Sequence, residues 1–272
     1  MKRMIVFAGG DKRQLFAAEQ LRAEGYDVFL SGFEKAEGFD IPELYDIYRA
    51  DVIVLPVRGI KDSIVPTYYS DKELKLNNKQ LSGKTVIMGK AETLNAQNCR
   101  VYDLLKREDF AEKNALPSAE GALKVAIENS DDTISGSKIL VIGYGRIGKA
   151  LSRILRALGA EVVVASRSDK KAQSIRCDKN TPVKTSDIKS LSGFDIVFNT
   201  ADALVIDSEV LNNSDNSALI IDLASVPGGV DFKTAETLGF KAVHALGLPG
   251  KYSPKAAGRI ISDAVLKIIK EE

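Results

Sequence analysis

One stretch of the chain constrains its fold more than any other: an apolar run, three spaced glycines and an amphipathic helix pattern. Residues 138–142 are typical of a buried parallel strand. Gly143, Gly145 and Gly148 then form G-x-G-x-x-G, and helical spacing continues to Gly159. Such glycines allow a tight turn, leave room for a pyrophosphate and let the helix pack on the strand. The stretch predicts a dinucleotide site, the alternative being a purely structural glycine turn. Its predicted cofactor contacts are Gly143, Tyr144, Gly145, Arg146, Ile147 and Gly148.

The next predicted strand, residues 161–165, indicates which dinucleotide is bound. NAD sites usually place an acid at the end of this strand, where it holds the ribose 2′-hydroxyl. Here Ser166, Arg167 and Ser168 follow, and the first carboxylate is Asp169. Hydroxyls and a guanidinium suit a 2′-phosphate dianion. We therefore predict NADP, bound by these three residues, unless Arg167 is an ordinary surface arginine.

The composition argues against several classes of protein. The 272 residues include 38 basic and 37 acidic residues, so a broad nucleic-acid or membrane surface is not expected. Two cysteines and the single histidine, His244, give no disulfide framework and no metal cluster, so no metal site is predicted. No apolar run approaches about 18 residues, and no signal peptide is recognisable at the N-terminus. We expect a soluble, cytoplasmic protein.

Alternating strand and helix patterns predict an α/β fold with two doubly wound parallel-sheet domains. The first domain is expected at 1–117. The second, a Rossmann domain, is expected at 118–272, with a linking helix 118–129 that starts near Leu116-Pro117 and a closing helix 254–269. By analogy with two-domain dehydrogenases, the closing helix should cross back onto the first domain. Residues 62–78 are expected to be an irregular loop with a short helix, and residues 102–105 a short strand.

Glycines and polar residues follow several predicted strands, at the edge where open α/β sheets bind ligands. The Gly9-Gly10 turn offers N–H groups to a substrate carboxylate, and Arg58 follows a neighbouring strand. In the second domain, Gly228 and Gly229 bring backbone close to substrate or nicotinamide, or else form a plain turn. Arg58 has the alternative of an exposed loop arginine. We expect the substrate to lie between the domains, with Ser118 and Glu120 beside it and Asn199, Thr200 and Ala201 over the nicotinamide half.

Taken together, these segments resemble the A-subunit family of dipicolinate synthase from spore-forming bacteria. The resemblance extends over nearly the whole chain, and its most specific parts are Gly-Gly-Asp-x-Arg-Gln-Leu from Gly9 and Pro-Gly-Gly-x-Asp-Phe from Pro227. Arg58 and His244 depart from the residue types expected at their positions. The matching segments are 9–15, 31–33, 55–57, 116–121, 143–148, 222–225, 227–232 and 247–254.

The resemblance implies oxidation of a dihydrodipicolinate-type heterocycle to dipicolinate (pyridine-2,6-dicarboxylate), with NADP⁺ taking the hydride. It also implies, as the partner in a two-subunit synthase, a flavoprotein-like B subunit, together with a role in sporulation in the mother-cell cytoplasm. We further expect a homo-oligomer. The two carboxylates of such a substrate call for donors at two separate points. Candidates are Arg13, Arg58 and the Gly9-Gly10 backbone at one end, and Ser225, the Gly228-Gly229 backbone and Lys251 at the other.

The sequence leaves the catalytic base and the reaction itself open. Glu120, His244 and Tyr252 are candidate bases, but a carboxylate at Glu120 would repel a dianion and the strand pattern also suits His244 as a packed core residue. One alternative function is an NADP-dependent reductase of a 2-oxo acid or another small carboxylate. Against this alternative, the chain has a single histidine and lacks the Arg plus Asp/Glu–His set expected of D-2-hydroxyacid dehydrogenases. Another is a non-catalytic NADP-sensing module, which would need no second pocket.

Overall fold

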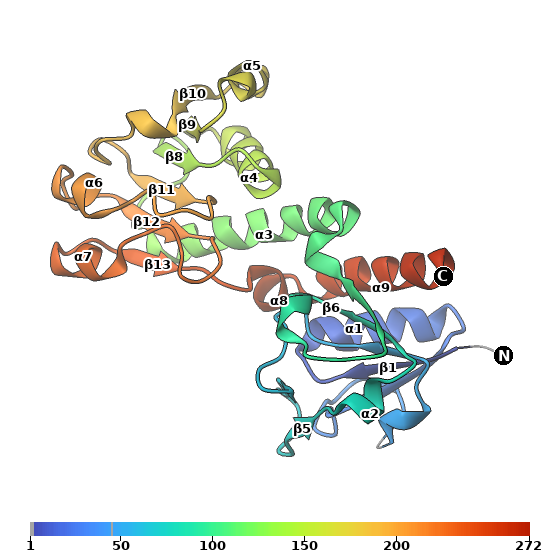
Figure 1. The fold of residues 1–272 in the computed structure, drawn as a ribbon. Coiled ribbons are helices and arrows are strands. Elements are labelled where there is room, and N and C mark those ends of the chain that lie inside the picture. Colours follow the sequence, from blue (N-terminus) through green and yellow to red (C-terminus); the bar gives the residue numbers. More distant parts are fainter. Residues whose placement is uncertain (1–2, 45) are drawn as a thin grey trace. The chain divides into compact units, whose positions relative to one another are not determined.

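The computed structural model describes residues 3–44 and 46–272 and divides into two compact units (Figure 1). Unit 1 comprises Met1–Asn114 and Pro249–Glu272, and unit 2 comprises Ala115–Leu248. Each unit is built around a parallel sheet with helices, which confirms the predicted fold class. The sequence-based division counted the closing helix with the second domain, whereas residues 249–272 pack in unit 1.

The sheet of unit 1 follows the order β2-β1-β3-β6-β7, with every neighbouring pair parallel. Ile5 and Phe7 face one buried cluster, and Val6 and Ala8 face another on the opposite side. Because a parallel sheet is covered on both faces, its strands are continuous apolar runs, which explains why the sequence pattern found them. The strands are β1 (Met4–Ala8), β2 (Asp27–Ser31), β3 (Val52–Val54), β6 (Thr85–Met88) and β7 (Arg100–Asp103).

Two local expectations in unit 1 need correction. The segment 62–78 contains a small hairpin, in which β4 (Ile64–Val65) pairs antiparallel with β5 (Leu74–Lys75), and α2 (Asn78–Leu81) begins at its end. The expected strand at 102–105 is displaced to β7, since Leu104–Lys106 forms a 3-10 turn. Asp103 caps that turn by accepting a hydrogen bond from Leu105 N at 2.9 Å.

The closing helix lies against the first helix of the chain (Figure 1). Helix α1 (Lys12–Ala23) begins at Asp11, which forms a capping box with Gln14. Helix α9 (Pro254–Glu271) approaches it at Gly258, where a built Cβ would lie only 2.6 Å from Phe16 Cβ. Ile261, Val265 and Ile268 join the same buried cluster as α1. The predicted crossing back onto the first domain is therefore confirmed.

The last residue fastens the end of α9 to the sheet of unit 1. The Glu272 side chain is 1% exposed and forms ion pairs with Arg3 and Arg100. It also accepts hydrogen bonds from Thr85 Oγ1 at 2.8 Å and Tyr102 OH at 3.3 Å. Burial acts to raise the pKa of this carboxyl, but the hydrogen bonds of Thr85 and Arg3 hold it below its usual range.

Helix α3 (Glu108–Asn129) starts earlier than the sequence suggested. The pattern placed the helix start near Pro117, because proline favours a first helical turn. Pro117 instead lies inside the helix, whose first turn carries the acidic residues Glu108 and Asp109. Acidic residues stabilise a helix N-terminus by interacting with its dipole.

The sheet of unit 2 follows the order β10-β9-β8-β11-β12-β13, all parallel, which is the strand order of a Rossmann fold. Edge strand β10 was not predicted. The strands are β8 (Lys138–Ile142), β9 (Glu161–Ser166), β10 (Thr181–Lys184), β11 (Ile196–Asn199), β12 (Leu219–Asp222) and β13 (Ala242–His244). The helices that follow the glycine turn are α4 (Arg146–Ala157), α5 (Ala172–Cys177), α6 (Ser208–Asn212), α7 (Phe232–Thr237) and α8 (Leu248–Tyr252).

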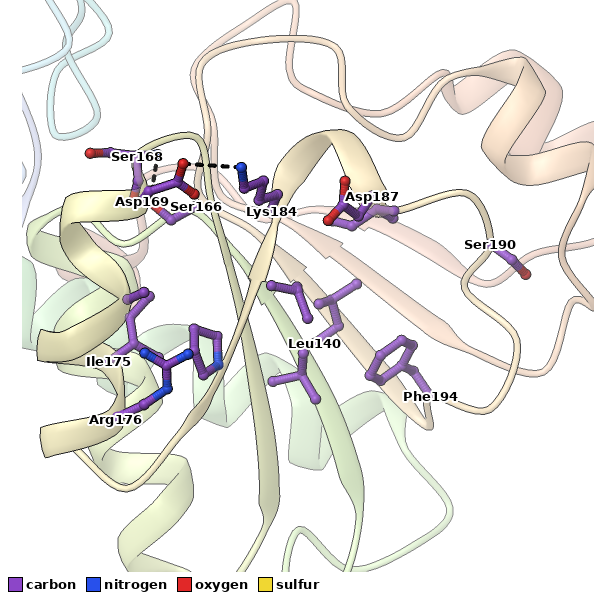
Figure 2. A pocket seen from close by; sticks show the side chains of 15 residues that line it. Leu140, Ser166, Ser168, Asp169, Ile175, Arg176, Lys184, Asp187, Ser190 and Phe194 are labelled. Carbon is purple, nitrogen blue, oxygen red and sulfur yellow. Dashed lines mark hydrogen bonds and ion pairs between the residues drawn. The ribbon is translucent and has the colours of Figure 1, made fainter.

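The connection from β10 to β11 leaves part of this sheet without a helix over it. In the described chain it contains only the 3-10 turn Thr185–Asp187 and coil. A cavity of about 410 Å³ lies there, with Leu140 and Phe194 on its apolar side and the Asp169–Lys184 ion pair at its polar side (Figure 2). None of the described helices is both long and apolar enough to cross a membrane.

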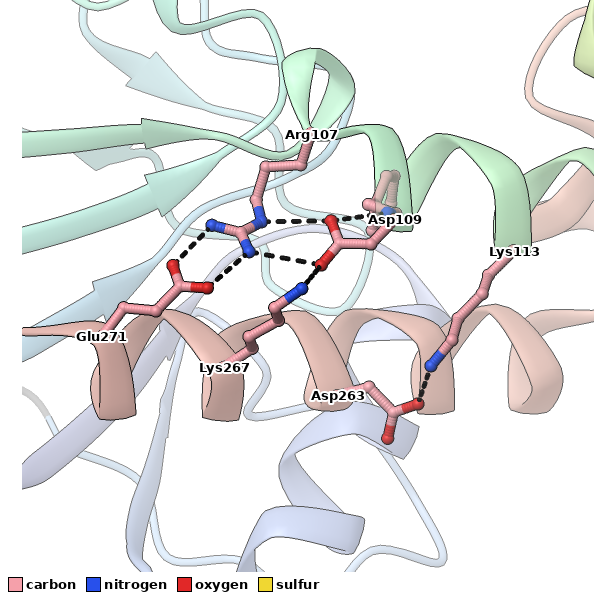
Figure 3. Close-up of polar contacts among 7 residues, drawn as sticks. Arg107, Asp109, Lys113, Asp263, Lys267 and Glu271 are labelled. Atoms are coloured by element: carbon pink, nitrogen blue, oxygen red, sulfur yellow. Dashed lines mark hydrogen bonds and ion pairs between the residues drawn. The ribbon is translucent and has the colours of Figure 1, made fainter.

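A network of ion pairs joins the start of α3 to α9 within unit 1 (Figure 3). Arg107 contacts Asp109 at 3.2 Å and Glu271 at 2.9 Å, and Lys267 contacts Asp109 at 2.6 Å. The hydrogen bonds from Arg107 and then Lys267 hold the pKa of Asp109 well below its usual range. Asp109 is the shared partner of the two cations.

We predict that Asp109→Asn destabilises the protein at neutral pH and not in strong acid. Because the folded pKa is depressed, the contribution of Asp109 is complete above the unfolded pKa of about 4. It is lost as the pH falls through the folded pKa. Exposure and salt screening keep the loss to about 1 kcal/mol or less. Urea unfolding of wild type and variant across pH measures the difference.

Glu112→Gln is the matched control, since Glu112 is exposed on the same helix and the described part of the chain shows no ion pair for it. A wild-type advantage over Asp109→Asn that stays constant into strong acid would contradict the prediction.

Candidate active site

The glycine turn after β8 has the geometry of a phosphate-binding turn. Gly143 has a φ of +99°, and its N–H donates to Ala165 O at 2.9 Å. A Cβ at Gly148 would lie 2.1 Å from Gly143 O, so α4 rests directly on the turn. A Cβ built at Gly145 meets nothing within 4 Å, and no side chain caps the helix that begins there. The turn therefore has open space at the N-terminus of α4, which suits an anionic ligand.

A cavity of about 280 Å³, called the cofactor cavity below, brings most of the predicted cofactor residues together. Its walls come from the glycine turn, the end of β9 and the loop after β11. Arg146 and Ile147 begin α4 and do not appear in the cavity wall of the described chain. The lining residues are Gly143, Tyr144, Gly145, Ser166, Arg167, Ser168, Lys171, Thr185, Thr200, Ala201, Asp202, Ala203 and Val205.

Asp169, the first acidic residue after β9, pairs with a lysine and does not line this cavity. Asp169 forms an ion pair with Lys184 at 3.0 Å and lines the neighbouring larger cavity (Figure 2). Ser166 Oγ accepts a hydrogen bond from Ser168 N at 3.2 Å, which holds the turn beyond the strand. The β9 side of the cofactor cavity thus presents hydroxyls and cations, and the described lining residues include no carboxylate on that side.

Asn199 has a different role from the one predicted. It is fully buried, does not line the cavity, and donates from Nδ2 to Asp222 Oδ1 at 2.8 Å. Asp222 also accepts from Ala224 N at 3.0 Å and Gly229 N at 2.7 Å. This carboxylate joins the end of β11 to the loop after β12. Sequence reasoning assigned it no role, although it lies in a segment that matched the family.

The Gly228-Gly229 turn is also built on Asp222 and does not supply free donors. Gly229 N donates to Asp222, and Gly228 N donates to Ser225 O at 2.8 Å. A Cβ at Gly228 would lie 2.5 Å from Asp222 Oδ2. The prediction that these backbone N–H groups bind substrate is therefore corrected: they fold the loop. Ser225 itself is exposed on it.

His244 is fixed by one ring nitrogen. Its Nε2 lies 2.8 Å from Ala224 O, and its ring stacks on Phe232 with centroids 5.2 Å apart. A carbonyl oxygen only accepts, so Nε2 carries the proton. In the neutral ring, Nδ1 is then the nitrogen that can accept a proton.

In unit 1, the Gly9-Gly10 turn does not present free donors either. Gly9 N donates to Ser31 O at 2.8 Å and Gly10 N to Pro66 O at 2.6 Å. The expectation that these N–H groups hold a carboxylate is wrong, because the unit's own carbonyls already accept their hydrogen bonds. Arg58 is exposed at the end of the neighbouring strand β3.

The guanidinium of Arg13 is committed to Asp11. Nε and Nη2 donate to the two oxygens of Asp11 at 2.9 and 2.8 Å, and Arg13 is only 5% exposed. Burial acts to raise the pKa of Asp11, but the hydrogen bonds and charge of Arg13 hold it below its usual range. A Cβ at Gly250 would lie 2.8 Å from Arg13 Nε, so this pair packs closely against helix α8. In the same helix, Lys251 Nζ lies 4.8 Å from the centre of the Tyr252 ring.

Ser118 and Glu120 do not sit at a helix N-terminus as predicted, because α3 begins at Glu108. Ser118 is buried and Glu120 is exposed, and neither lines the described cofactor cavity. Lys171, by contrast, lines that cavity and was missed. The available signal was its position in the basic segment just after Ser168.

Comparisons with known proteins identify the family of the chain. A model of the N-terminal domain of the dipicolinate synthase A subunit matches residues 4–104, and a model of the NAD-binding domain of D-isomer specific 2-hydroxyacid dehydrogenases matches residues 104–225. The dipicolinate synthase A subunit of Bacillus subtilis (strain 168) is 34% identical over 98% of this chain and 96% of its own length.

Solved structures give the same result. The dipicolinate synthase A subunit from Bacillus halodurans matches with a TM-score of 0.88 and 32% identity, covering 98% of this chain and 97% of that one. The Bacillus subtilis A chain matches with a TM-score of 0.88 and 33% identity, covering 100% and 97%. A transhydrogenase from Sinorhizobium meliloti, at 16% identity and a TM-score of 0.72 over 98% and 93% of the two chains, shares the fold alone.

We predict that Gly145→Val abolishes dinucleotide binding without unfolding the protein. Gly145 has a φ of −85°, which valine also adopts, and space for the side chain is open. That space is where a phosphate would approach, so the dissociation constant should rise at least about a hundredfold, as several charge-assisted hydrogen bonds are lost. Calorimetric titration measures this, with thermal unfolding as the control for the fold. Ordinary affinity in the variant would place the site elsewhere.

Proposed function

The chain belongs to the A-subunit family of dipicolinate synthase and is an NAD(P)-dependent oxidoreductase, and from this premise we propose that it oxidises a dihydrodipicolinate-type precursor to dipicolinate with NADP⁺. The observation that carries the proposal is the cavity at the glycine turn. Its β9 side offers Ser166, Arg167 and Ser168, with no carboxylate among the described lining residues there. Such a surface favours a 2′-phosphate dianion over a bare ribose hydroxyl.

Hydride loss from a dihydropyridine dicarboxylate produces an aromatic ring, so the reaction is downhill once substrate and cofactor are aligned. When bound, NADP⁺ supplies the hydride acceptor. The protein must then orient the ring, hold its two carboxylates and take one proton. We assign carboxylate binding to Arg58, Lys251 and the exposed Ser225. Arg13 supports this arrangement indirectly, since its guanidinium is paired with Asp11.

Among the candidate bases, the geometry favours His244. Its Nε2–H donates to Ala224 O, which orients the ring and leaves Nδ1 as the proton acceptor. Stacking on Phe232 restricts the ring further. Glu120 is exposed on α3, and a carboxylate there would repel a dianionic substrate. We therefore propose that Nδ1 of His244 takes the proton released as the ring becomes aromatic, with Tyr252 as the remaining candidate.

We also propose that the working enzyme contains a second, flavoprotein-like polypeptide, the B subunit, and that this chain forms a homo-oligomer in the mother-cell cytoplasm of a spore-forming bacterium. The test of function mixes freshly prepared dihydrodipicolinate precursor with NADP⁺ and this chain, with and without the B subunit. Reduced nicotinamide is followed by absorbance and dipicolinate by its ultraviolet spectrum. No reduced cofactor with either preparation would refute the proposed reaction.

We predict that Arg167→Ala weakens NADP⁺ binding roughly tenfold to a hundredfold, the scale of one charge-assisted hydrogen bond, and leaves NAD⁺ binding nearly unchanged. Calorimetric titration with each cofactor gives the ratio. Arg176→Ala is the control, because Arg176 lines the neighbouring cavity and not this one. Equal weakening for both cofactors would refute the assignment of the 2′-phosphate to Arg167.

We predict that Arg58→Ala raises KM for the dicarboxylate about tenfold and leaves cofactor affinity alone, since the arginine contributes a charge-assisted contact to one carboxylate. Steady-state kinetics at saturating NADP⁺ measures KM. Arg49→Ala removes another exposed arginine of unit 1 and serves as the control. An unchanged KM would remove Arg58 from the substrate site.

A further inference from the structure

Lys171 lies in the cofactor cavity at a point that the sequence did not indicate. It ends the 3-10 turn Asp169–Lys171, directly before α5, and lines the cavity together with Arg167. Its Nζ donates to Tyr144 O at 3.0 Å. Tyr144 stands between the first two glycines of the turn, so the ammonium group lies at the glycine turn itself.

The carbonyl that Lys171 contacts is held in place from behind. The Tyr144 ring is buried, and its hydroxyl hydrogen-bonds Ser174 O at 3.3 Å and the carboxylate of Asp178. Asp178 in turn pairs with Arg153 at 2.9 Å. These contacts fix α5 against the glycine turn, and with it the segment that carries Lys171. Both the segment that carries Lys171 and the Tyr144 carbonyl that its ammonium contacts therefore belong to rigid elements.

The charges of the segment after β9 are sorted between two cavities. Asp169 faces Lys184 and lines the larger cavity, whereas Arg167 and Lys171 line the cofactor cavity. The carboxylate that does line the cofactor cavity, Asp202, comes from the opposite side, after β11. Two cations on the β9 side thus meet the cofactor without a neutralising acid of their own segment among the described lining residues.

We propose that Lys171 is the second cation of the 2′-phosphate site and, with Arg167, determines the preference for NADP over NAD. The inference rests on the proposed use of NADP. A phosphate dianion is bound best by more than one cation, and the compact ammonium of lysine can exchange a carbonyl partner for a phosphate oxygen without rearranging the backbone. The planar guanidinium of Arg167 supplies the directional contact, and Lys171 supplies a point charge from the side of the glycine turn.

The experiment compares Lys171→Gln with Lys170→Gln, which makes the same change of charge one residue earlier, at a side chain outside the described cavity wall. Calorimetric dissociation constants are measured for NADP⁺, NAD⁺, 2′,5′-ADP and 5′-AMP, with circular dichroism to verify folding. We expect Lys171→Gln to weaken NADP⁺ and 2′,5′-ADP about tenfold, on the scale of a charge-assisted contact to a partly exposed group, and to change NAD⁺ and 5′-AMP less than about twofold. Lys170→Gln should change none of them appreciably, and Lys171→Arg should retain most of the preference.

The outcomes separate this inference from the proposal on which it rests. Wild-type protein that binds 2′,5′-ADP no better than 5′-AMP would overturn both. A wild-type preference for 2′,5′-ADP that Lys171→Gln leaves intact would overturn the role of Lys171 alone. Equal weakening of NAD⁺ and NADP⁺ by Lys171→Gln would also overturn it, since Lys171 would then bind the pyrophosphate. If Lys171→Gln misfolds, Lys171→Met removes the same charge and supplies the same comparison.

Discussion

A buried carboxylate holds together the part of unit 2 in which the chemistry is proposed to occur. Asp222 is fully buried, and burying a charge is costly unless hydrogen bonds replace water. Asn199 supplies one of those hydrogen bonds from the end of β11, and Ala224 and Gly229 supply two from the loop after β12. The end of β11 and the loop after β12 therefore keep one relative position, and Ala224 in turn presents its carbonyl to His244. Removing the carboxylate would leave buried N–H groups without acceptors, which costs more than the hydrogen bonds themselves contribute.

The same constraint explains which glycines could be understood from the sequence. Gly143, Gly145 and Gly148 belong to one local motif, whose spacing alone states how strand, turn and helix meet. Gly228 and Gly229 are small because side-chain atoms of Asp222 and Asn199 occupy the space a Cβ would need. Gly10 donates to Pro66 O, from a hairpin far along the chain. Whether a backbone N–H is free depends on such distant partners, and no sequence pattern reports them. The sequence therefore indicated turns at Gly9-Gly10 and Gly228-Gly229, but it did not show that their N–H groups already donate within the protein.

The fold shows a similar division between local and distant information. Strands such as β1, β8 and β12 are apolar on both faces, because helices cover both sides of a parallel sheet, and the pattern reveals them directly. Edge strand β10 reads Thr-Pro-Val-Lys and is partly exposed, so its sequence resembles a loop. It is a strand because it pairs with β9 at the edge, where proline is tolerated. For helix α3 the local signal was misleading, because Pro117 suggests a helix start but lies inside the helix. The helix begins at an acidic first turn, where Asp109 pairs with Arg107 and Lys267.

The fold distributes the charges of one short segment between two cavities. In the sequence, Ser166-Arg167-Ser168-Asp169-Lys170-Lys171 contains an acid suited to a ribose hydroxyl and cations suited to a phosphate. The absence of an acid at the end of β9 is visible in the sequence, but the direction of Asp169 is not. Lys184, at the end of β10, pairs with Asp169 at the neighbouring cavity. An edge strand that the sequence pattern overlooked thus supplies the partner of this acid, whereas Arg167 and Lys171 line the cavity at the glycine turn.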